Sequence, residues 1–232
     1  MPRTSPVQPE LSIIVPVLNE AAALPNLLAH LSHWQQRGAE VVLVDGGSID
    51  QTVDIARGAG FEIITTSAGR ASQMNAGALA CHSEHLLFLH ADTRLPDNAD
   101  YILVRTFTSS SLVWGRFDVA IEGRSKMLPV VATLMNWRSR LTGIATGDQA
   151  LFMTRELFNK VGGFPEQPLM EDIEISKRLK TISPPVCLKQ KVITAGRRWD
   201  ARGSWPTILL MWQLRWAYWR GVPAQLLAER YR

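Results

Sequence analysis

The sequence predicts an α/β protein whose central sheet is mostly parallel and carries helices on both faces. Short apolar runs alternate with amphipathic helical patterns through the first half of the chain, which is typical of βαβ units. Such units pair their strands in parallel through right-handed crossovers. With 232 residues, of which 46% are hydrophobic, the chain is long enough to bury one substantial core.

Four strands and three helices are predicted in the first half. The strands are the apolar runs 11–17, 40–45, 61–66 and 84–92. The helix after the first strand carries Leu24, Leu27, Leu28, Leu31 and Trp34 on one face, at helical spacing. The stretch SIDQTVDIARGAG predicts a capped helix that ends at glycine, and GRASQMNAGALACH predicts a helix of small residues.

The second half mixes longer strands with helices. A strand is predicted at 112–123, and KMLPVVATLMNWRSRLTGI predicts a helix. TGDQALFMT is expected to be a loop that enters a strand, and short helices are predicted in RELFNKVGGF and MEDIEISKRLKTI. VCLKQKVITA predicts a further strand, and a tryptophan-rich helix is predicted at 204–220. We expect this half to complete a site that begins in the first.

Charge and composition exclude several classes of protein. The net charge of +4 gives little support to a nucleic-acid partner. No apolar run approaches the roughly 20 residues of a membrane-spanning helix, and no signal peptide is visible, while two cysteines without a CxxC pair favour a reducing compartment. We therefore expect a cytoplasmic protein. Residues 189–232 contain nine Lys or Arg and only two acids, which suggests contact with an anionic membrane surface.

Polar residues follow three of the predicted parallel strands. Asn19 and Glu20 follow the first strand, Asp45 the second, and His90 and Asp92 the fourth. Each alone is usually a cap or turn residue. Ligands of open α/β sheets bind outside the carboxyl ends of the strands, so three such clusters on one edge predict a ligand site there.

Glycine placement excludes the common nucleotide and hydrolase motifs. PVLNE stands after the first strand, where a dinucleotide-binding GxGxxG would be needed, and the glycines follow the second strand instead, in VDGGSID. The sequence also contains no Walker A motif and no GxSxG nucleophile elbow.

SIIVPVLNE, VDGGSIDQT and the HADT that ends the fourth strand together resemble the family-2 glycosyltransferases of the GT-A fold. GRASQMNAGA, LFLHADTRLP, TGDQALF and GGFPEQPLMEDIEIS are similar to a short bacterial subgroup of that family. The resemblance runs from about residue 11 to 220. It implies a GT-A, Rossmann-like fold and inverting transfer of a sugar from a nucleotide diphosphate sugar, of the UDP type, to an acceptor hydroxyl.

This resemblance also divides the chain into functional parts. The parts are a flexible N-terminus (1–10), one glycosyltransferase domain (11–203) with a nucleotide-sugar-binding half (11–95) and an acceptor and catalytic half (96–203), and an amphipathic helical tail (204–232). Two other functions stay open. One is a sugar-nucleotide-binding or regulatory protein without turnover. The other is a nucleotidyltransferase of the same fold, whose glycine-rich loop after the first strand is absent here.

The donor-binding residues that the resemblance implies lie along the strand ends. Residues after the first two strands would hold the base and ribose, and Arg70 would face the diphosphate. A cation in the first turn of a helix is disfavoured by the helix dipole unless an anion is bound there; a solvated surface arginine is the alternative. The full set is Pro16, Val17, Asn19, Glu20, Asp45, Gly46, Arg70, Gln73, Asn75, His90 and Ala91.

Asp92 corresponds to the final aspartate of the family's DXD motif, which implies a divalent ion bound with the diphosphate. Mg²⁺ and Mn²⁺ prefer oxygen ligands and can be held by one or two carboxylates plus phosphate oxygens. His90 stands in place of the first aspartate as the second metal ligand. Because an imidazole suits Mn²⁺ better than Mg²⁺, the identity of the ion stays open. Gly46 also departs from the family, in which many members carry a second aspartate there.

The resemblance places the catalytic base in the pair Glu171 and Asp172. An inverting transfer needs a carboxylate that takes the proton of the attacking hydroxyl, and we assign Asp172, with Glu171 as the alternative. Outside the family, the same pair reads as ordinary acids in the first turn of a helix. Asp148 is a third candidate, although an acceptor-pocket role suits it better. The expected acceptor pocket contains Gly147, Asp148, Gln149 and Trp199.

A stripe of large apolar residues marks the tail. Its members are Trp205, Leu209, Trp212, Trp216 and Trp219, with Arg215 and Arg220 nearby. Tryptophan and arginine on one helix face suit a membrane interface, whereas packing on the core is the more common use of such a stripe. Some short relatives glycosylate apolar molecules, so a lipid or carotenoid-like acceptor is expected. RRWD lacks the glutamine of the QxxRW motif, which argues against a processive synthase.

Overall fold

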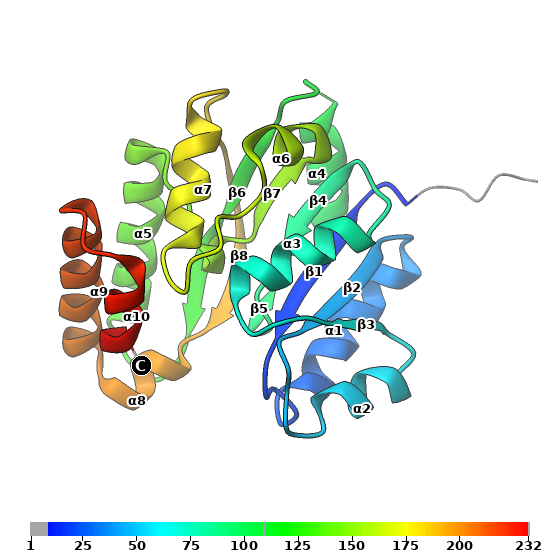
Figure 1. Ribbon diagram of the computed structural model, residues 1–232, viewed down its shortest axis with the longest axis horizontal. Coiled ribbons are helices and arrows are strands. Elements are labelled where there is room, and N and C mark those ends of the chain that lie inside the picture. The colour runs from blue at the N-terminus through cyan, green and yellow to red at the C-terminus, as the bar shows by residue number, and fades with distance from the viewer. Residues whose placement is uncertain (1–8, 109, 232) are drawn as a thin grey trace, which may run out of the picture.

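The computed structural model describes residues 9–108 and 110–231. Most of the N-terminal segment 1–10, predicted to be flexible, lies outside the described residues. Within them, one eight-stranded sheet has the order β3-β2-β1-β4-β7-β6-β8-β5, and helices cover both of its faces (Figure 1). The predicted α/β class is confirmed.

The first half of the chain forms the parallel part of the sheet. Its elements are β1 (Ser12–Val17), α1 (Leu24–Gln36), β2 (Glu40–Asp45), α2 (Thr52–Gly58), β3 (Glu62–Thr65), α3 (Arg70–Ala80) and β4 (His85–Phe88). β1 pairs in parallel with β2 and β4, and β2 pairs in parallel with β3. All seven predicted elements are present, but β4 ends at Phe88, so His90 and Asp92 belong to the loop that follows it.

The second half adds strands of both directions. Its elements are β5 (Thr93–Arg94), α4 (Ala99–Phe107), β6 (Trp114–Glu122), α5 (Leu128–Thr142), the 3-10 turn η1 (Gly147–Gln149), β7 (Leu151–Thr154), α6 (Arg155–Val161), α7 (Glu171–Lys180), β8 (Val186–Ala195), α8 (Arg197–Arg202), α9 (Ser204–Trp219) and α10 (Ala224–Tyr231). β7 is antiparallel to β4 and β6, and β5 is antiparallel to β8. β6 and β8 are parallel. The sequence patterns did not predict β5, α4, α8 or α10.

Alternation along the strands explains why helices cover both faces. Ile13 and Leu43 belong to one buried cluster, with Trp34 of α1. Ile14 and Val44 belong to the cluster on the other face, with residues of α3, α6 and α7. Strands that are buried on both faces carry such continuous apolar runs. Burial of each large apolar side chain stabilises the fold by about 1.5–3 kcal/mol.

A third, smaller cluster attaches α9 and α10 to the loop before α7. Leu214 and Leu227 pack there against Leu169, Met170 and Ile173. Figure 1 shows α9 and α10 side by side at one end of the molecule, next to α5.

The tryptophan stripe of α9 faces solvent. Its exposed fractions are 65% for Trp205, 55% for Leu209, 68% for Trp212, 62% for Trp216 and 77% for Trp219. The expectation that this stripe packs on the core is therefore wrong, because α9 uses a different face, that of Leu214, for packing. None of the helices in the described part of the chain combines the length and the apolar character needed to cross a membrane.

Candidate active site

Two connected cavities lie where the strand ends meet the helices of the second half. We call the first, of about 480 Å³, the strand-end cavity, because the loops after β1 and β4 line it. We call the second, of about 520 Å³, the interhelical cavity, because α5 and α9 form its walls. Arg70, His90, Asp148 and Trp199 line both. The two cavities therefore meet at residues that the sequence predicted for the site.

Three arginines make the strand-end cavity suited to an anion. Arg70, Arg197 and Arg198 line it, together with Asp92 and Glu20. The Arg197 guanidinium lies 3.4 Å from the Glu20 carboxylate and 3.9 Å from that of Asp92. Arg198 packs its guanidinium over the Tyr231 ring at 3.8 Å, and its Nη1 is shielded from solvent without a hydrogen-bond partner among the described residues. An oxyanion would supply that partner.

Arg70 opens α3 and links this cluster to the acids of α7. Its side chain is solvent-accessible in both cavities. Enclosure by protein acts to lower its pKa, but the carboxylates of Glu171, Asp148 and Asp172 outweigh this, so that the pKa of Arg70 is raised. The predicted cation at the start of the helix is thus held by acids as well as being available to a ligand.

Two predicted donor residues use their side chains to close a loop. Asp45 is 1% exposed, and its carboxylate accepts hydrogen bonds from the backbone N–H groups of Gly47 at 2.9 Å and Ser48 at 3.1 Å. Asn19 has a left-handed backbone, with φ of 53°, and its Oδ1 accepts from the N–H of Ile49 at 2.9 Å. Neither residue lines the cavity. They shape the loops that border it.

Three further predicted residues hold α3 in place. The Gln73 amide donates to the carbonyls of Val17 at 2.8 Å and Val44 at 2.7 Å, and so joins the ends of β1 and β2. Gly46 lies directly beneath that amide, since a Cβ there would approach it to 3.1 Å. Asn75 bonds to the backbone of the loop before α7. Of these, only Gln73 reaches the strand-end cavity, where Pro16 and Ala91 also lie.

The predicted metal ligands fit an ion unequally. The Nδ1 of His90 lies 3.3 Å from Asp148, and its Nε2 packs against Gly147, where a Cβ would approach it to 2.1 Å. The Nδ1 of His90 is therefore engaged with Asp148, and Gly147 lies close against the other side of the ring. The Asp92 carboxylate is 30% exposed and lines the strand-end cavity. No group of three or more His, Cys, Asp or Glu with metal-ligand geometry occurs in residues 9–108 and 110–231, so Asp92 fits only a one-carboxylate site that phosphate oxygens complete.

Glu171, which is buried, and Asp172, which is half-buried, both line the interhelical cavity. Burial raises the pKa of both, and repulsion from neighbouring acids adds to this effect: Asp172 acts on Glu171, and Asp148 acts on Asp172. Asp172 nevertheless accepts hydrogen bonds from the N–H groups of Gly147 at 3.1 Å and Ile173 at 2.7 Å. These bonds fix the orientation of a carboxylate whose raised pKa suits a general base.

Asp148 has the opposite character. Burial acts to raise its pKa, but the hydrogen bond and charge of His90 outweigh burial, so the pKa of Asp148 is lowered. An acid that stays ionised and paired is a poor proton acceptor. Asp148 therefore suits the pocket-shaping role that the sequence predicted.

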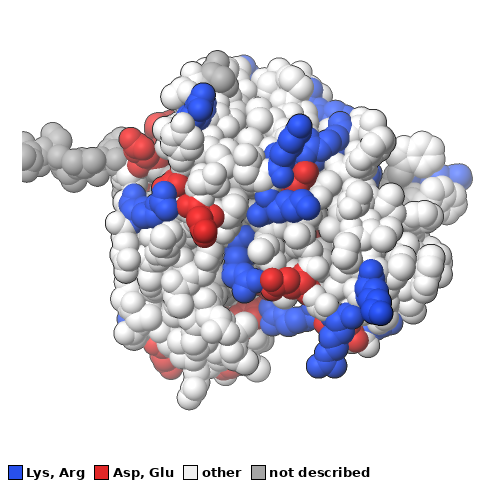
Figure 2. Space-filling model, turned by 180° about the vertical axis from the view of Figure 1, so that it is seen from behind, with Lys and Arg blue, Asp and Glu red and all other residues white. Residues whose placement is uncertain are grey.

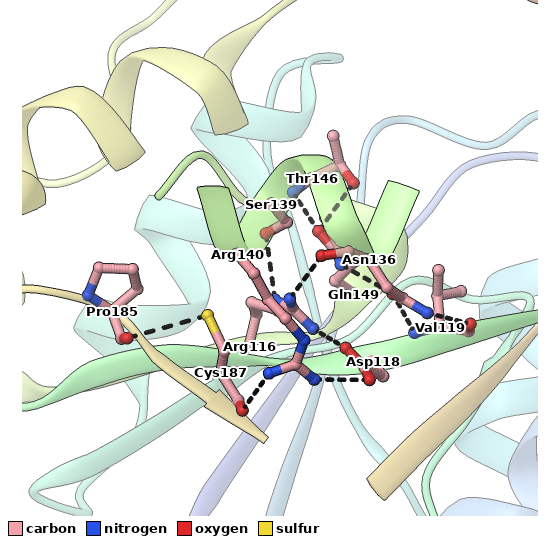
Figure 3. A network of polar contacts seen from close by, with 10 residues as sticks. All are labelled: Arg116, Asp118, Val119, Asn136, Ser139, Arg140, Thr146, Gln149, Pro185 and Cys187. Atoms are coloured by element: carbon pink, nitrogen blue, oxygen red, sulfur yellow. Dashed lines mark hydrogen bonds and ion pairs between the residues drawn. The ribbon is translucent and has the colours of Figure 1, made fainter. Parts of the chain in front are cut away.

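A buried polar network holds the loop that carries Gly147 and Asp148 (Figure 3). Asn136 of α5 bonds to the backbone of Val119 at 2.8 and 2.9 Å and accepts from the Gln149 amide at 3.2 Å. Gln149 accepts in turn from the N–H of Thr146 at 3.2 Å. Arg116 donates to the Asn136 carbonyl at 3.1 Å. The predicted pocket residue Gln149 is thus fully buried and positions the loop from below.

The interhelical cavity has mainly apolar walls. Val131, Leu134 and Met135 of α5 face Ile208 and Met211 of α9 across it. The predicted pocket residues Gly147, Asp148 and Trp199 also line it.

The sequence interpretation missed several lining residues. They are Arg138, Arg197, Arg198, Arg215 and Tyr231. A signal existed for Arg138, which follows Val131, Leu134 and Met135 at helical spacing and so shares their face. None existed for Tyr231, because only tertiary packing brings α10 to the site.

Comparison with known proteins places the chain in a family. The model of the family described as "Glycosyl transferase family 2" matches residues 12–162, more than half of the chain. The chain therefore belongs to glycosyl transferase family 2. This membership and the fold agree with the resemblance that the motifs indicate.

Two curated relatives match part of the chain. A PGL/p-HBAD biosynthesis glycosyltransferase of Mycobacterium bovis is 38% identical over 118 residues, covering 46% of this chain and 46% of that protein. A dolichyl-phosphate beta-glucosyltransferase of Drosophila melanogaster is 34% identical over 108 residues, covering 38% and 33%. The chain thus matches less than half the length of these relatives.

Two solved structures share the fold. The mannosyltransferase PcManGT of Pyrobaculum calidifontis, in complex with GDP-Man and Mn²⁺, has a TM-score of 0.63 at 19% identity, over 91% of this chain and 62% of that one. S. aureus TarS in complex with UDP has a TM-score of 0.62 at 19% identity, over 80% and 60%. At such identities the likeness shows the fold alone, which is the GT-A fold.

Proposed function

We propose that the protein transfers a sugar from a UDP-sugar to the hydroxyl of an apolar acceptor, with inversion at the anomeric carbon. One observation carries this proposal. A cationic cavity and an apolar cavity meet at Arg70 and Asp148, and the half-buried carboxylate of Asp172 lines the apolar cavity next to this junction. A donor diphosphate fits the first cavity, an acceptor fits the second, and the reacting atoms would lie where the two join.

The donor is assigned to the strand-end cavity. Arg70, Arg197 and Arg198 would bind the diphosphate through charge-assisted hydrogen bonds, with the sugar directed at Asp148 and Trp199. Support for the nucleotide comes from TarS, which was solved with UDP and with UDP-GlcNAc. PcManGT, solved with GDP-Man and Mn²⁺, supports a nucleotide sugar together with a divalent ion.

A divalent ion, when bound, would neutralise charge on the diphosphate. Asp92 would hold it with phosphate oxygens as the remaining ligands, and His90 would stay paired with Asp148. Arg197, 3.9 Å from Asp92, would share the neutralisation. The chain's own cations would therefore neutralise part of the negative charge of the diphosphate, together with the metal ion.

In the transfer step, Asp172 accepts the proton of the acceptor hydroxyl. The hydroxyl oxygen forms its bond to the anomeric carbon as the bond from that carbon to the diphosphate breaks, and the nucleotide diphosphate leaves. Because burial and Asp148 raise the pKa of Asp172, the ionised form is a stronger base than an exposed aspartate. Activity is expected to fall as the pH drops through that raised pKa, since only the ionised carboxylate can accept the proton.

The acceptor and the membrane are linked through α5 and α9. Exposed apolar residues continue from the cavity rim onto the surface of both helices: Val130, Leu134, Trp137 and Leu141 on α5, and the tryptophan stripe on α9. In Figure 2 the part of the surface where these helices lie is nearly free of Lys, Arg, Asp and Glu, with cations at its border. Aromatic residues with cations at their edge suit an anionic lipid surface, which would deliver an apolar acceptor to the cavity.

Donor binding can be tested by thermal denaturation with UDP, GDP and their sugar conjugates, with and without Mn²⁺. Because a ligand that binds the native state raises apparent stability by mass action, UDP-sugars are expected to raise the melting temperature most. Mn²⁺ should add to this shift in the unmodified protein and not in Asp92→Ala. A protein that no nucleotide stabilises would contradict the proposal, and donor binding without any transfer would favour the non-catalytic alternative.

A further inference from the structure

Arg138 is a half-buried cation, and two of its guanidinium nitrogens have no hydrogen-bond partner among the described residues. It lies in α5 and lines the interhelical cavity. Its Nε and Nη2 atoms are shielded from solvent and have no hydrogen-bond partner among the described residues, nor does it form an ion pair within them. An arginine remains protonated in a protein. The N–H groups on Nε and Nη2 are therefore charged donors without an acceptor among the described residues.

Two other enclosed arginines, Arg116 and Arg155, have a partner at each guanidinium nitrogen. Arg116, on the strand beneath, donates to Ser139 at 3.0 Å and to the Asn136 carbonyl at 3.1 Å, and it pairs with Asp118. Arg155 donates to three backbone carbonyls at 2.7 to 2.8 Å. An unsatisfied buried charge is costly, so the departure at Arg138 indicates that something outside the chain completes it.

Arg198 is a second arginine of this site with an unpartnered nitrogen. That nitrogen is Nη1, and the residue lines the strand-end cavity, where an anionic diphosphate is proposed. Arg138 occupies the corresponding place in the other cavity. Among the described residues, each cavity is therefore lined by an arginine with a solvent-shielded nitrogen that has no hydrogen-bond partner.

The neighbours of Arg138 restrict the ligand. Val131 and Leu134 precede it on the same helix face, and Met211 of α9 lines the same cavity. Arg70 and Arg215 are further cations that line it. Burial lowers the pKa of Arg138, and the charge of Asp172 offsets only part of this effect. The charge of Asp172 thus acts on Arg138 through space, but Asp172 does not form an ion pair with its guanidinium. A cation that lines a mainly apolar cavity suits an oxyanion that is attached to an apolar group.

We propose that the acceptor is an anionic amphiphile, whose phosphate or carboxylate group binds Arg138 while its apolar part lies between α5 and α9. This inference rests on the proposed function, because it assigns the chemical class of the acceptor. Arg138 orients the acceptor so that its hydroxyl faces Asp172. Arg215, on α9, lines the same cavity and adds to the attraction.

The proposal is tested by binding of four probes to the protein saturated with UDP, which blocks the strand-end cavity. The probes are decyl phosphate, decanoate, decanol and inorganic phosphate, each below the concentration at which it aggregates. At least one of the two anionic decyl compounds is expected to bind about tenfold or more tightly than decanol, and whichever of them binds more tightly identifies the anionic group. Inorganic phosphate should bind more weakly than decyl phosphate.

Variants tie the preference to one side chain. Arg138→Gln should remove the preference for the anion, Arg138→Lys should keep part of it, and Arg57→Gln, on the far helix α2, should leave it unchanged. Because the cation is unpaired, Arg138→Gln should melt no lower than the unmodified protein and should still bind UDP. That separates the loss of the subsite from a loss of folding.

Each failure has its own meaning. If decanol binds as tightly as both anionic compounds with UDP in place, or if the preference survives in Arg138→Gln, the anion subsite is overturned while the proposed function stands. If inorganic phosphate matches decyl phosphate, the amphiphile is overturned. If the unmodified protein does not bind UDP at all, the proposed function itself fails.

Discussion

The strand-end cavity and the interhelical cavity are built by different means. Loops after β1 and β4 form one side of the first, so residues such as Glu20 and Asp92 reach it close to the strands that they follow. Helix α8 adds Arg197 and Arg198. Two helices, α5 and α9, form the second, and its shape depends on how α9 and α10 pack against the start of α7. The comparison teaches that part of the donor side follows from local sequence, whereas the acceptor side follows mainly from tertiary structure.

The largest expected effect is on the rate of sugar transfer, and it falls at Asp172, next to the junction of the two cavities. Asp172→Asn should lower the rate of sugar transfer by about 10²- to 10⁴-fold, because it removes the proton acceptor, while UDP binding stays within about twofold. Asp54→Asn, an exposed acid on α2, is the matched control. A full rate in Asp172→Asn would move the base to Glu171, or remove it from this helix altogether.

The strand-end cavity alone is probed at Arg198. Arg198→Gln should weaken UDP binding by about 10- to 100-fold, because hydrogen bonds to charged groups contribute roughly 1.5–3 kcal/mol, and binding of decyl compounds should be little changed. Calorimetric titration measures both, with Arg57→Gln as the control. Equal losses for both ligands would mean that the two cavities do not bind separately.

Repulsion between the carboxylates of Glu171 and Asp172 is tested through the free energy of unfolding. Since the pKa of Glu171 is raised in the fold by burial and by Asp172, its protonated form is favoured there, and the stability this gives is lost as the pH rises through the folded-state pKa. Glu171→Gln should therefore raise the free energy of unfolding at pH 7 by about 1 kcal/mol. The gain should vanish below the ordinary pKa of a glutamic acid.

Denaturant titration at two pH values measures this difference. Glu156→Gln, at an exposed position of α6, should change the free energy of unfolding by less than about 0.5 kcal/mol at either pH. A Glu171→Gln protein that is less stable at pH 7 would show that the carboxylate is held by partners such as Arg70 rather than destabilised.

The smallest effect on stability is expected on the solvent-exposed face of α9, one of the two helices that form the interhelical cavity. Replacing Trp205, Trp216 and Trp219 by serine should change the free energy of unfolding by less than about 0.5 kcal/mol per site, because all three are exposed. Co-sedimentation with anionic phospholipid vesicles should fall sharply. Tyr101→Ser, at an exposed aromatic of α4, is the control, and vesicle binding that survives the triple change would exclude this surface as the membrane contact.

Periodicity and strand-end polarity were sufficient to predict the elements from β1 to β4 and most of the later ones. They failed for α8, whose six residues are largely polar, and for β5, which has only two residues. Neither element is long enough to show a period. The missing α4 carries its buried residues at Ala99, Leu103 and Phe107, a spacing too sparse to stand out beside a turn.

The candidate site was predictable in type but not in orientation. Arg70, Asp92, Asp148 and Asp172 all reach a cavity as expected. Asp45, although it also ends a strand, turns back on its own loop. A sequence shows that a polar group stands at a strand end; whether it faces a ligand or a backbone N–H depends on the loop geometry. Arg138 was missed for a related reason, since an arginine in a helix is normally solvated.

The most direct test of the account is UDP release from a UDP-sugar in the presence of decyl compounds that carry both a hydroxyl and an anionic group. We expect UDP to form only when donor and amphiphile are both present, with the rate lost in Asp172→Asn and the acceptor affinity weakened in Arg138→Gln. A protein that binds UDP-sugars tightly, yet releases no UDP with any amphiphilic hydroxyl compound, would contradict the claim that the two cavities form one transfer site.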